Sequence, residues 1–588
     1  MARRWLVSFI ACAVSLAVVA SPTTAATQGI NGTPVMVHYQ TPEKPFDVDV
    51  SPDGEWAAVR TGSVLPGAQG YAGHLHLIHL APPFPVTSYF QEMDVSFWGS
   101  EALRIFDDRL VSLAGAQGQS DAYVQLQDGL PLSLSPAMSA IGIDVDAAIQ
   151  AATGHLVAVS RGWTGLSATD LETSQPIPTY PVPVHSTNGT GLYSSGISNA
   201  VRTTPARFIA IANSYLPDAP NQYPGWVGIG ALGQMVGVTF GLGGCIPNQS
   251  ACNSTTQGLS VHDVTLTPNQ KYAIVSGNRS YGVYDMAGAS ELSNHWITGA
   301  NPAAQPLPWV SFRTAAGIAA GMTTDSVESS NSRAVIVGHN NAPHNTACPS
   351  GTDQARWRVA IINLRTLDDV VYEDAPVGCA SSRAHDVAIT PNGAYAFMTT
   401  RGGTYRIDLN SAWPTRPPDP YWDGTDPLDT SFGSAFVADS IVCTNTRAVA
   451  IGRNISTFTP QAIVINVNLS PDLSGAYTFV ELGQSNSSKI VPTDVVIDPS
   501  EQFAVVRSTD VAGPPSINKY GRISVINLST GTLVGEWDHT SFSTPPFTID
   551  FGAAWGVDHV EATAEYAITA GEDVSGNVGG WFQVLKLP

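Results

Sequence analysis

The chain is poor in cationic side chains and in charge generally. Lysine and arginine number 27 against 48 aspartates and glutamates, so the formal net charge is −21 over 588 residues, and only 13% of the residues are charged. Nucleic acids and anionic membrane surfaces are bound through basic patches, so this balance argues against both as partners. An acidic surface is compatible instead with solubility outside the cell, with calcium or with a cationic ligand.

Several catalytic motifs are also absent. The sequence has no His-Glu-x-x-His, no Gly-x-Ser-x-Gly, no phosphate loop and no Cys-x-x-Cys, so zinc proteases, α/β-hydrolases, P-loop enzymes and attached haem lack support. One Gly-x-Gly-x-x-Gly occurs, at Gly228, Gly230 and Gly233. The residues after it predict a second strand, where a dinucleotide site needs a helix, so we interpret these glycines as part of a hairpin.

Long hydrophobic runs are confined to the first residues. Residues 1–26 carry two arginines, an apolar run from Trp5 to Ala20 and small residues up to Ala26. This pattern predicts a secretory signal peptide; a membrane anchor is the alternative, although the run is short of the about 20 residues that a span needs. We therefore expect a secreted or periplasmic protein without a membrane span, with repeats filling residues 27–588.

Cysteine is scarce, with six in the chain. Cys245 and Cys252 bracket a polar loop and are expected to form a disulfide in an oxidising compartment. Cys348 and Cys379 fall in loops of one repeat and form the second expected pair. Cys443 lies on a predicted strand and is expected to be a buried free thiol. These pairings rest on proximity, because cysteine spacing does not give connectivity.

What the sequence has in abundance is one repeated unit. FDVDVSPDGEWAAVR (46–60), HDVTLTPNQKYAIVS (262–276), HDVAITPNGAYAFMTT (385–400) and TDVVIDPSEQFAVVR (493–507) each combine an alternating strand, a tight turn and a second alternating strand. Self-similarity of this kind is the signature of a repeat architecture. With weaker copies included, the units start at Asp47, Asp94, Asp144, Asn199, Asp263, Asp325, Asp386, Asp439, Asp494 and Asp558.

The spacing of the starts predicts the fold class. Between 47 and 64 residues separate successive starts, which is room for four short strands and their turns. The last unit lacks a fourth strand, and TPVMVHYQ (33–40) is an isolated strand that would complete it. We therefore predict an all-β protein, a β-propeller of about ten four-stranded repeats in one ring closed by the N-terminal strand, with two smaller propellers as the alternative.

The units resemble the YVTN-type β-propeller repeats. The match is carried by Asp47 to Gly54, by Asp386 to Gly393 with Tyr395 and Ala396, and by Gly521 to Leu528. The resemblance implies a propeller and leaves the activity open, because the family includes both binding scaffolds and enzymes. Ten units depart from the four to eight blades that are typical of propellers.

Two histidines occupy the same place in two units. His262 and His385 each precede the first aspartate of a unit, at the start of the strand expected to line the axis. Converging imidazoles would serve as acid/base groups or metal ligands of an enzyme. In the alternative interpretation, each histidine caps a turn of its own repeat by a local hydrogen bond.

Two loops are the remaining candidate sites. His339 and His344, in GHNNAPHN, are expected in a loop between two strands, either as part of a binding rim or as polar surface. DPYWDGTDPLD (419–429) gathers carboxylates that would suit a weak calcium site, although a solvated acidic loop explains them equally; they are Asp419, Asp423, Asp426 and Asp429. Tyr421 and Trp422 in the same loop are candidates for stacking on a sugar ring.

The function that these features favour is an exported propeller that binds a ligand or protein partner through its funnel or loop face. The first alternative is an extracellular lyase or hydrolase, acting on a polysaccharide or a lactone, with its active site in the axial funnel. The second alternative is a structural repeat protein of the cell surface. Calcium is the one cofactor that the sequence suggests.

Overall fold

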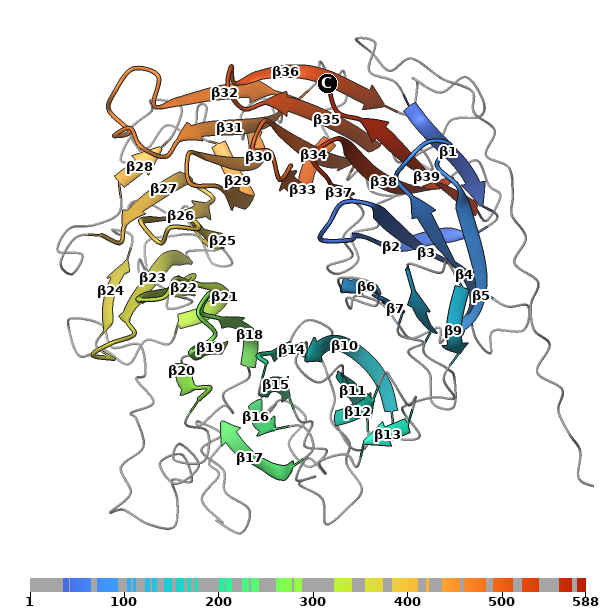
Figure 1. Ribbon diagram of the computed structural model, residues 1–588. Coiled ribbons are helices and arrows are strands. Elements are labelled where there is room, and N and C mark those ends of the chain that lie inside the picture. The colour runs from blue at the N-terminus through green and yellow to red at the C-terminus, as the bar shows by residue number, and fades with distance from the viewer. Residues whose placement is uncertain are drawn as a thin grey trace, which may run out of the picture.

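A computed structural model of the protein shows β-sheets arranged around a central opening (Figure 1). It describes residues 35–41, 43–64, 71–93, 103–106, 109–112, 122–126, 130–134, 142–150, 155–162, 166–170, 175–177, 200–205, 207–213, 225–231, 234–242, 261–277, 280–287, 322–340, 355–367, 369–373, 383–410, 419–421, 436–454, 459–482, 490–510, 521–538, 560–573 and 579–588. Over these ranges every element is a strand, and no helix is present that could span a bilayer.

The described strands form ten antiparallel sheets, numbered here in chain order. Sheet 1 contains β2 (Lys44–Val50), β3 (Trp56–Val64), β4 (Tyr71–His79) and β5 (Val86–Met93), and sheet 2 contains β6 (Leu103–Phe106), β7 (Arg109–Ser112), β8 (Ala122–Gln125) and β9 (Leu130–Leu134). Sheet 3 contains β10 (Gly142–Gln150), β11 (His155–Gly162), β12 (Leu166–Asp170) and β13 (Gln175–Ile177), and sheet 4 contains β14 (Ala200–Thr203), β15 (Phe208–Asn213), β16 (Gly225–Ala231) and β17 (Gln234–Leu242). Sheet 5 contains β18 (Val261–Leu266), β19 (Tyr272–Gly277) and β20 (Ser280–Asp285).

The remaining sheets continue the pattern. Sheet 6 contains β21 (Met322–Ser329), β22 (Arg333–Asn340), β23 (Arg356–Asn363) and β24 (Asp369–Glu373), and sheet 7 contains β25 (Ala384–Ile389), β26 (Tyr395–Thr400), β27 (Gly403–Asp408) and β28 (Asp419–Tyr421). Sheet 8 contains β29 (Phe436–Cys443), β30 (Arg447–Asn454), β31 (Pro460–Asn466) and β32 (Tyr477–Glu481), and sheet 9 contains β33 (Ile490–Ile497), β34 (Phe503–Asp510), β35 (Gly521–Asn527) and β36 (Thr532–Asp538). Sheet 10 contains β37 (Val560–Ala562), β38 (Tyr566–Asp573) and β39 (Gly579–Lys586) together with β1 (Val35–Thr41).

The predicted β-propeller with ten repeats is confirmed. Within the described residues nine sheets have four strands and sheet 5 has three, which differs from the four predicted for every unit. The first strand of each sheet lies nearest the opening, apart from sheet 10, where β37 has that place (Figure 1). The first two glycines of the Gly-x-Gly-x-x-Gly stretch belong to a hairpin, because Gly228 and Gly230 of β16 pair with Thr239 and Gly237 of β17, while Gly233 lies outside the described residues.

The repeated turn explains the first hairpin of a unit. In sheet 7 the Thr390 backbone N–H donates to the Tyr395 carbonyl at 2.9 Å, and the Gly393 N–H donates to the Thr390 carbonyl at 2.7 Å. Gly393 has a φ of +69°, a left-handed conformation that glycine adopts without steric cost. The Asn392 side-chain oxygen accepts from the Thr390 hydroxyl at 2.8 Å, so the polar residues of the turn satisfy one another.

The core lies between the sheets rather than inside one of them. On β35, Ile523 and Val525 pack with residues of sheet 10, while Ile526 of the same strand packs with residues of sheet 8. All three are at most 1% exposed. A strand that is apolar on both faces therefore marks a sheet stacked between two others, as the sequence of the 494 unit predicts.

The two ends of the described chain share sheet 10. Strand β1 pairs antiparallel with β39, with Val35 opposite Leu585 and Thr41 opposite Gly580. This confirms the predicted pairing of the N-terminal strand with the incomplete last unit. Sheet 10 in turn contacts sheet 1, since β38 and β39 lie against β2.

Seven of the innermost strands carry a bulge near their start, namely β2, β10, β18, β21, β25, β29 and β33. In β25, Ala384 pairs with Thr400 and Asp386 with Thr399, which leaves His385 as the extra residue. The same irregularity leaves His262 extra in β18, Asp325 in β21 and Asp439 in β29. Two of the sequence alignments were therefore wrong by one position: Asp325 and Asp439 correspond to the histidines, and Ser326 and Ser440 correspond to Asp263 and Asp386.

The bulges share an edge of the sheets with long connections. The chain between β13 and β14, between β17 and β18 and between β36 and β37 joins an outer strand to the next innermost strand. Strand direction alternates in an antiparallel sheet, so the fourth strand ends at the same edge of the ring at which the innermost strand of the next sheet starts. Each of these connections therefore begins and ends at that edge. We call this the bulge edge; the tight turns such as 390–395 lie at the opposite edge.

Candidate functional site

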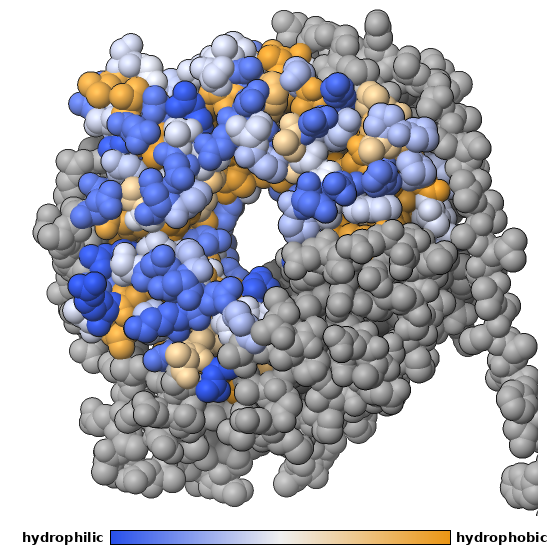
Figure 2. Space-filling view, viewed as in Figure 1, coloured by the Kyte–Doolittle hydropathy of each residue, from blue (hydrophilic) through white to orange (hydrophobic). Residues whose placement is uncertain are grey.

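Four consecutive innermost strands place an ionisable residue at the same bulge position. These residues alternate in kind, with His262, Asp325, His385 and Asp439 on β18, β21, β25 and β29. The strands border the central opening, and Figure 2 shows hydrophilic side chains among those around it. Bulges frequently redirect side chains beside functional sites, so this row is the candidate site.

Asp325 of this row pairs with His339, which lies on the neighbouring strand β22. The His339 Nδ1 lies 2.8 Å from the Asp325 Oδ2. His339 is 5% exposed, whereas Asp325 is an exposed residue. A carboxylate that accepts from Nδ1–H fixes the imidazole orientation and tautomer and leaves Nε2 as the nitrogen that can exchange a proton.

His339 was predicted in a loop, and this was wrong. It is the seventh residue of β22 and pairs with Thr323 on one side and Trp357 on the other. The pairing of β22 continues through Gly338, His339 and Asn340, whose polar sequence had indicated a loop. The structure thereby brings His339 to the bulge of β21.

His385 lies close enough to this pair to interact with it electrostatically. Burial lowers the pKa of His385, the charge on Asp325 raises it, and Arg401, Arg383 and His339 lower it further. The Nε2 of His385 is buried and has no hydrogen-bond partner within the described residues. A buried nitrogen without a partner costs free energy, which a bound group that supplied one would recover.

His262, on the neighbouring sheet 5, contacts the same bulge of β21. Its Nδ1 lies 2.7 Å from the carbonyl oxygen of Thr324, the residue before Asp325. The hydrogen bond crosses from sheet 5 to sheet 6, so His262 does not cap a turn of its own repeat. The three described histidines of the prediction therefore lie at the bulge of β21: His339 pairs with Asp325, His385 interacts with it electrostatically, and His262 contacts the preceding residue, Thr324.

The repeated aspartates have a different role, because they join neighbouring sheets. Asp386 Oδ2 accepts from Ser440 Oγ and Ile441 N–H of sheet 8, both at 3.0 Å. Its Oδ1 accepts from its own Val387 N–H at 2.8 Å and from Ser326 Oγ of sheet 6 at 3.2 Å. Asp47 and Asp263 likewise accept from the next sheet, through the N–H groups of Leu103 and Val327.

Two further carboxylates on innermost strands have shifted acidities. Burial raises the pKa of Glu328 to about 7, with the charges of Asp263 and Asp386 adding to the effect. Burial also raises the pKa of Asp439 to about 6, opposed by Arg453 and Arg401. Carboxylic acids that titrate near neutrality occur at sites of proton transfer as well as in structural clusters.

No group of three His, Cys, Asp or Glu side chains within the described ranges is placed to hold a metal ion. The calcium prediction falls mostly outside these ranges: Asp419 and Tyr421 belong to strand β28, which pairs with β27, so their placement in a loop was wrong. Cys443 is a free thiol on β29, as predicted. Outside the described residues lie residues 1–26, Cys245, Cys252, His344, Cys348, Cys379, Trp422, Asp423, Asp426 and Asp429.

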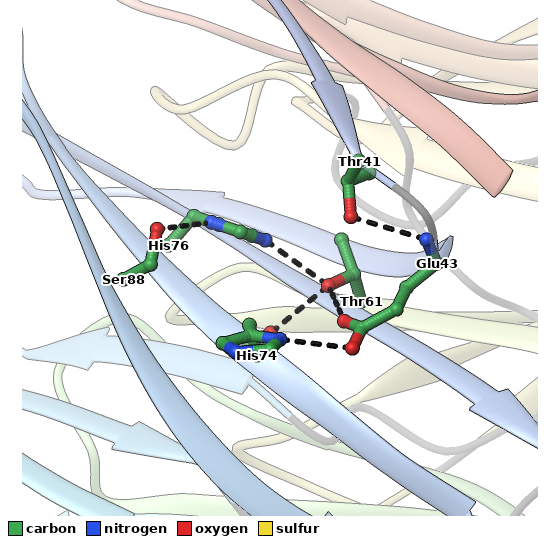
Figure 3. Close-up of polar contacts among 6 residues, drawn as sticks. All are labelled: Thr41, Glu43, Thr61, His74, His76 and Ser88. Carbon is green, nitrogen blue, oxygen red and sulfur yellow. Dashed lines mark hydrogen bonds and ion pairs between the residues drawn. The ribbon is translucent and has the colours of Figure 1, made fainter. Parts of the chain in front are cut away.

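A second polar network was missed by the sequence analysis. It joins Thr41, Glu43, Thr61, His74, His76 and Ser88, and we call it the seam network (Figure 3). The available signal was HLH in β4, because alternation along a strand places His74 and His76 on one face. The partners Glu43 and Thr61 come from the β1–β2 connection and from β3, which spacing alone does not bring together.

The comparisons with known proteins give matches among solved structures. No family model and no curated protein matches it. Similar solved structures include the β-propeller domain of Cps50 (Swd1) from Myceliophteria thermophila, at 9% identity over 84% of this chain and 98% of that one, with a TM-score of 0.34. The Dos1 propeller has 12% identity over 76% and 92% with a TM-score of 0.36, and Kluyveromyces lactis Hsv2 has 10% over 67% and 96% with 0.28.

Proposed function

We propose that the chain is an exported, YVTN-type β-propeller that binds a ligand or protein partner at the bulge edge of sheets 5 to 8. The observation that carries the proposal is the convergence of His262, His339 and His385 on the β21 bulge, at Thr324 and Asp325. The long connections between sheets begin and end at the same edge, and such connections commonly carry recognition residues. Export rests on the predicted signal peptide over residues 1–26.

Binding is tested with immobilised protein against defined libraries of oligosaccharides and of peptides, followed by calorimetry on any hit. We expect His385→Ala and Asp325→Asn to weaken binding at least tenfold while leaving thermal stability nearly unchanged. Lys271→Ala, in the exposed β18–β19 turn at the opposite edge, is the matched control and should bind like the wild type. Equal binding by all four proteins would refute a site at Asp325.

A lyase or hydrolase is the second candidate, and the Asp325–His339 pair favours it. An imidazole held by a carboxylate through Nδ1 is arranged to accept a proton at Nε2, and Asp439 or Glu328 would supply the acid. Turnover of polysaccharides or lactones should then fall by a factor of about 100 or more in His339→Gln. Binding without turnover in the wild type would leave the first proposal alone standing.

A further inference from the structure

The seam network lies where sheet 1 meets sheet 10. The His76 ring on β4 contacts Phe582 of β39 at a centroid distance of 5.1 Å and Tyr39 of β1 at 5.3 Å. Tyr39 and Phe582 stack on each other at 4.8 Å. Glu43 sits in the short connection between β1 and β2, so the network touches every element that ties the N-terminal strand to its neighbours.

The hydrogen bonds define where the protons are. The Thr61 hydroxyl donates to Glu43 Oε2 at 2.6 Å, and His74 Nδ1 lies 2.8 Å from Glu43 Oε1. Since the Thr61 hydrogen is used on Glu43, the His76 Nε2–H, at 3.1 Å, must donate to the Thr61 oxygen. The His76 Nδ1 then accepts from the Ser88 hydroxyl at 2.8 Å. Burial lowers the pKa of His76 and so favours this neutral ring, and Glu43 accepts one hydrogen bond on each carboxylate oxygen.

We infer that the seam network is an acid-sensitive latch, in which protonation of His76 weakens the attachment of β1 and sheet 1 to β39. A proton on Nδ1 would force the Ser88 hydroxyl to turn and accept, and would place a positive charge on a ring that packs against Tyr39 and Phe582. His76 is 2% exposed, so water cannot compensate for that charge. The titratable groups facing it within the described residues are Glu43, His74 and the Tyr39 phenol.

The direction of the pH effect follows from two opposite shifts. Burial lowers the pKa of His76 to about 3, with the neighbouring His74 adding to the effect, so its contribution to stability is lost as the pH falls from 6.5 towards 3. The hydrogen bond to Glu43 raises the pKa of His74, so its contribution is complete below pH 6.5. Acidification below 6.5 therefore adds the penalty at His76 while His74 contributes nothing further to oppose it.

The latch is tested on the full chain by unfolding in urea at about pH 7 and about pH 5. In the wild type, His76 should lower the folding equilibrium constant on the order of tenfold between these conditions. His76→Gln removes the titrating group, so the change with pH should shrink by that factor. Glu328 and Asp439 titrate in the same window in every variant and cancel in the comparison.

His79→Gln is the matched control, since His79 lies on the same strand but packs on Trp56 instead of the seam. It should keep the wild-type pH dependence. Hydrogen exchange supplies the local readout: at acidic pH the β1 amides should exchange faster relative to those of β34. An unchanged pH dependence in His76→Gln, or equal acceleration of exchange in β1 and β34, would overturn the latch. Thr61→Ser keeps the hydroxyl and should therefore keep the wild-type pH dependence.

Discussion

At the scale of single residues, aspartates that look equivalent in the repeats have two different structural roles. Asp386 is half-buried and accepts four hydrogen bonds from three sheets, whereas Asp325 is exposed and pairs with His339. The sequence alignment equated them because it matched aspartates. The bulge inserts one residue, so the physical equivalent of Asp386 in β21 is Ser326, which donates to Asp386 itself. Matching residues by type therefore gave the wrong equivalence, because the backbone register of the strands determines which positions correspond.

Asp386→Ala is expected to destabilise the protein by about 3 kcal/mol or more, because it leaves the Ile441 and Val387 N–H groups buried without their acceptor. Ser326→Ala removes one hydrogen bond of the same carboxylate and should cost only about 1 kcal/mol. Urea unfolding of both variants measures the difference. Equal and small effects would mean that the aspartate does not hold the sheets together.

Cys443 should be chemically inert in the folded protein. Burial raises the pKa of its thiol to about 12, and the carboxylates of Glu328 and Asp386 add to the shift, so almost no thiolate exists at neutral pH. Iodoacetamide should modify Cys443 only after unfolding in urea, as mass spectrometry would report. Rapid modification of the native protein would contradict the raised pKa of the thiol.

At the scale of elements, strands were predictable and the bulge was not. Alternating and doubly apolar runs located β33 to β36 closely, because side-chain burial follows strand periodicity. The sequence suggested that His262 and His385 converge, but a bulge adds one residue without changing composition, so the part of Asp325 and His339 in this site could not be anticipated. Placing His339 needed the length of β22, and polar residues at a strand end conceal that length.

The bulge of β29 requires a glycine on the neighbouring strand. A Cβ at Gly452 would lie 1.8 Å from the Val437 carbonyl oxygen, next to the bulged Asp439. Gly452→Ala should therefore destabilise the protein by about 3 kcal/mol or more, since the backbone must shift. Gly475→Ala is the control: its φ is +81° but nothing lies within 4 Å, so only strain of about 1 kcal/mol is expected in thermal unfolding. Similar costs would argue against the close approach.

At the scale of the whole molecule, sheet 10 combines both ends of the described chain. Removing residues 35–41 would leave β39 as an edge beside the fully buried Phe582, Val584 and Leu585. We expect lower thermal stability and concentration-dependent association, because exposed apolar edges pair with one another. Analytical ultracentrifugation and calorimetry measure both effects.

The control for this deletion is a permuted chain that carries residues 35–41 after Pro588, joined by a short Gly-Ser linker. Val35 lies opposite Leu585, so the linker has only a hairpin to span. This chain should recover the wild-type stability and remain monomeric. A deletion variant as stable as the parent would show that β1 contributes little to sheet 10.

The pairing of β1 with β39 also governs when the protein can finish folding. Of the described strands, β1 leaves the ribosome first and its partner leaves last, so β1 waits through nearly the whole of synthesis. Contacts between such distant segments form slowly, because closing so long a loop costs entropy before any contact repays it. Sheet 10 can therefore be assembled only after β39 has left the ribosome, and until then the nascent chain retains β1 as an unpaired strand that chaperones can hold.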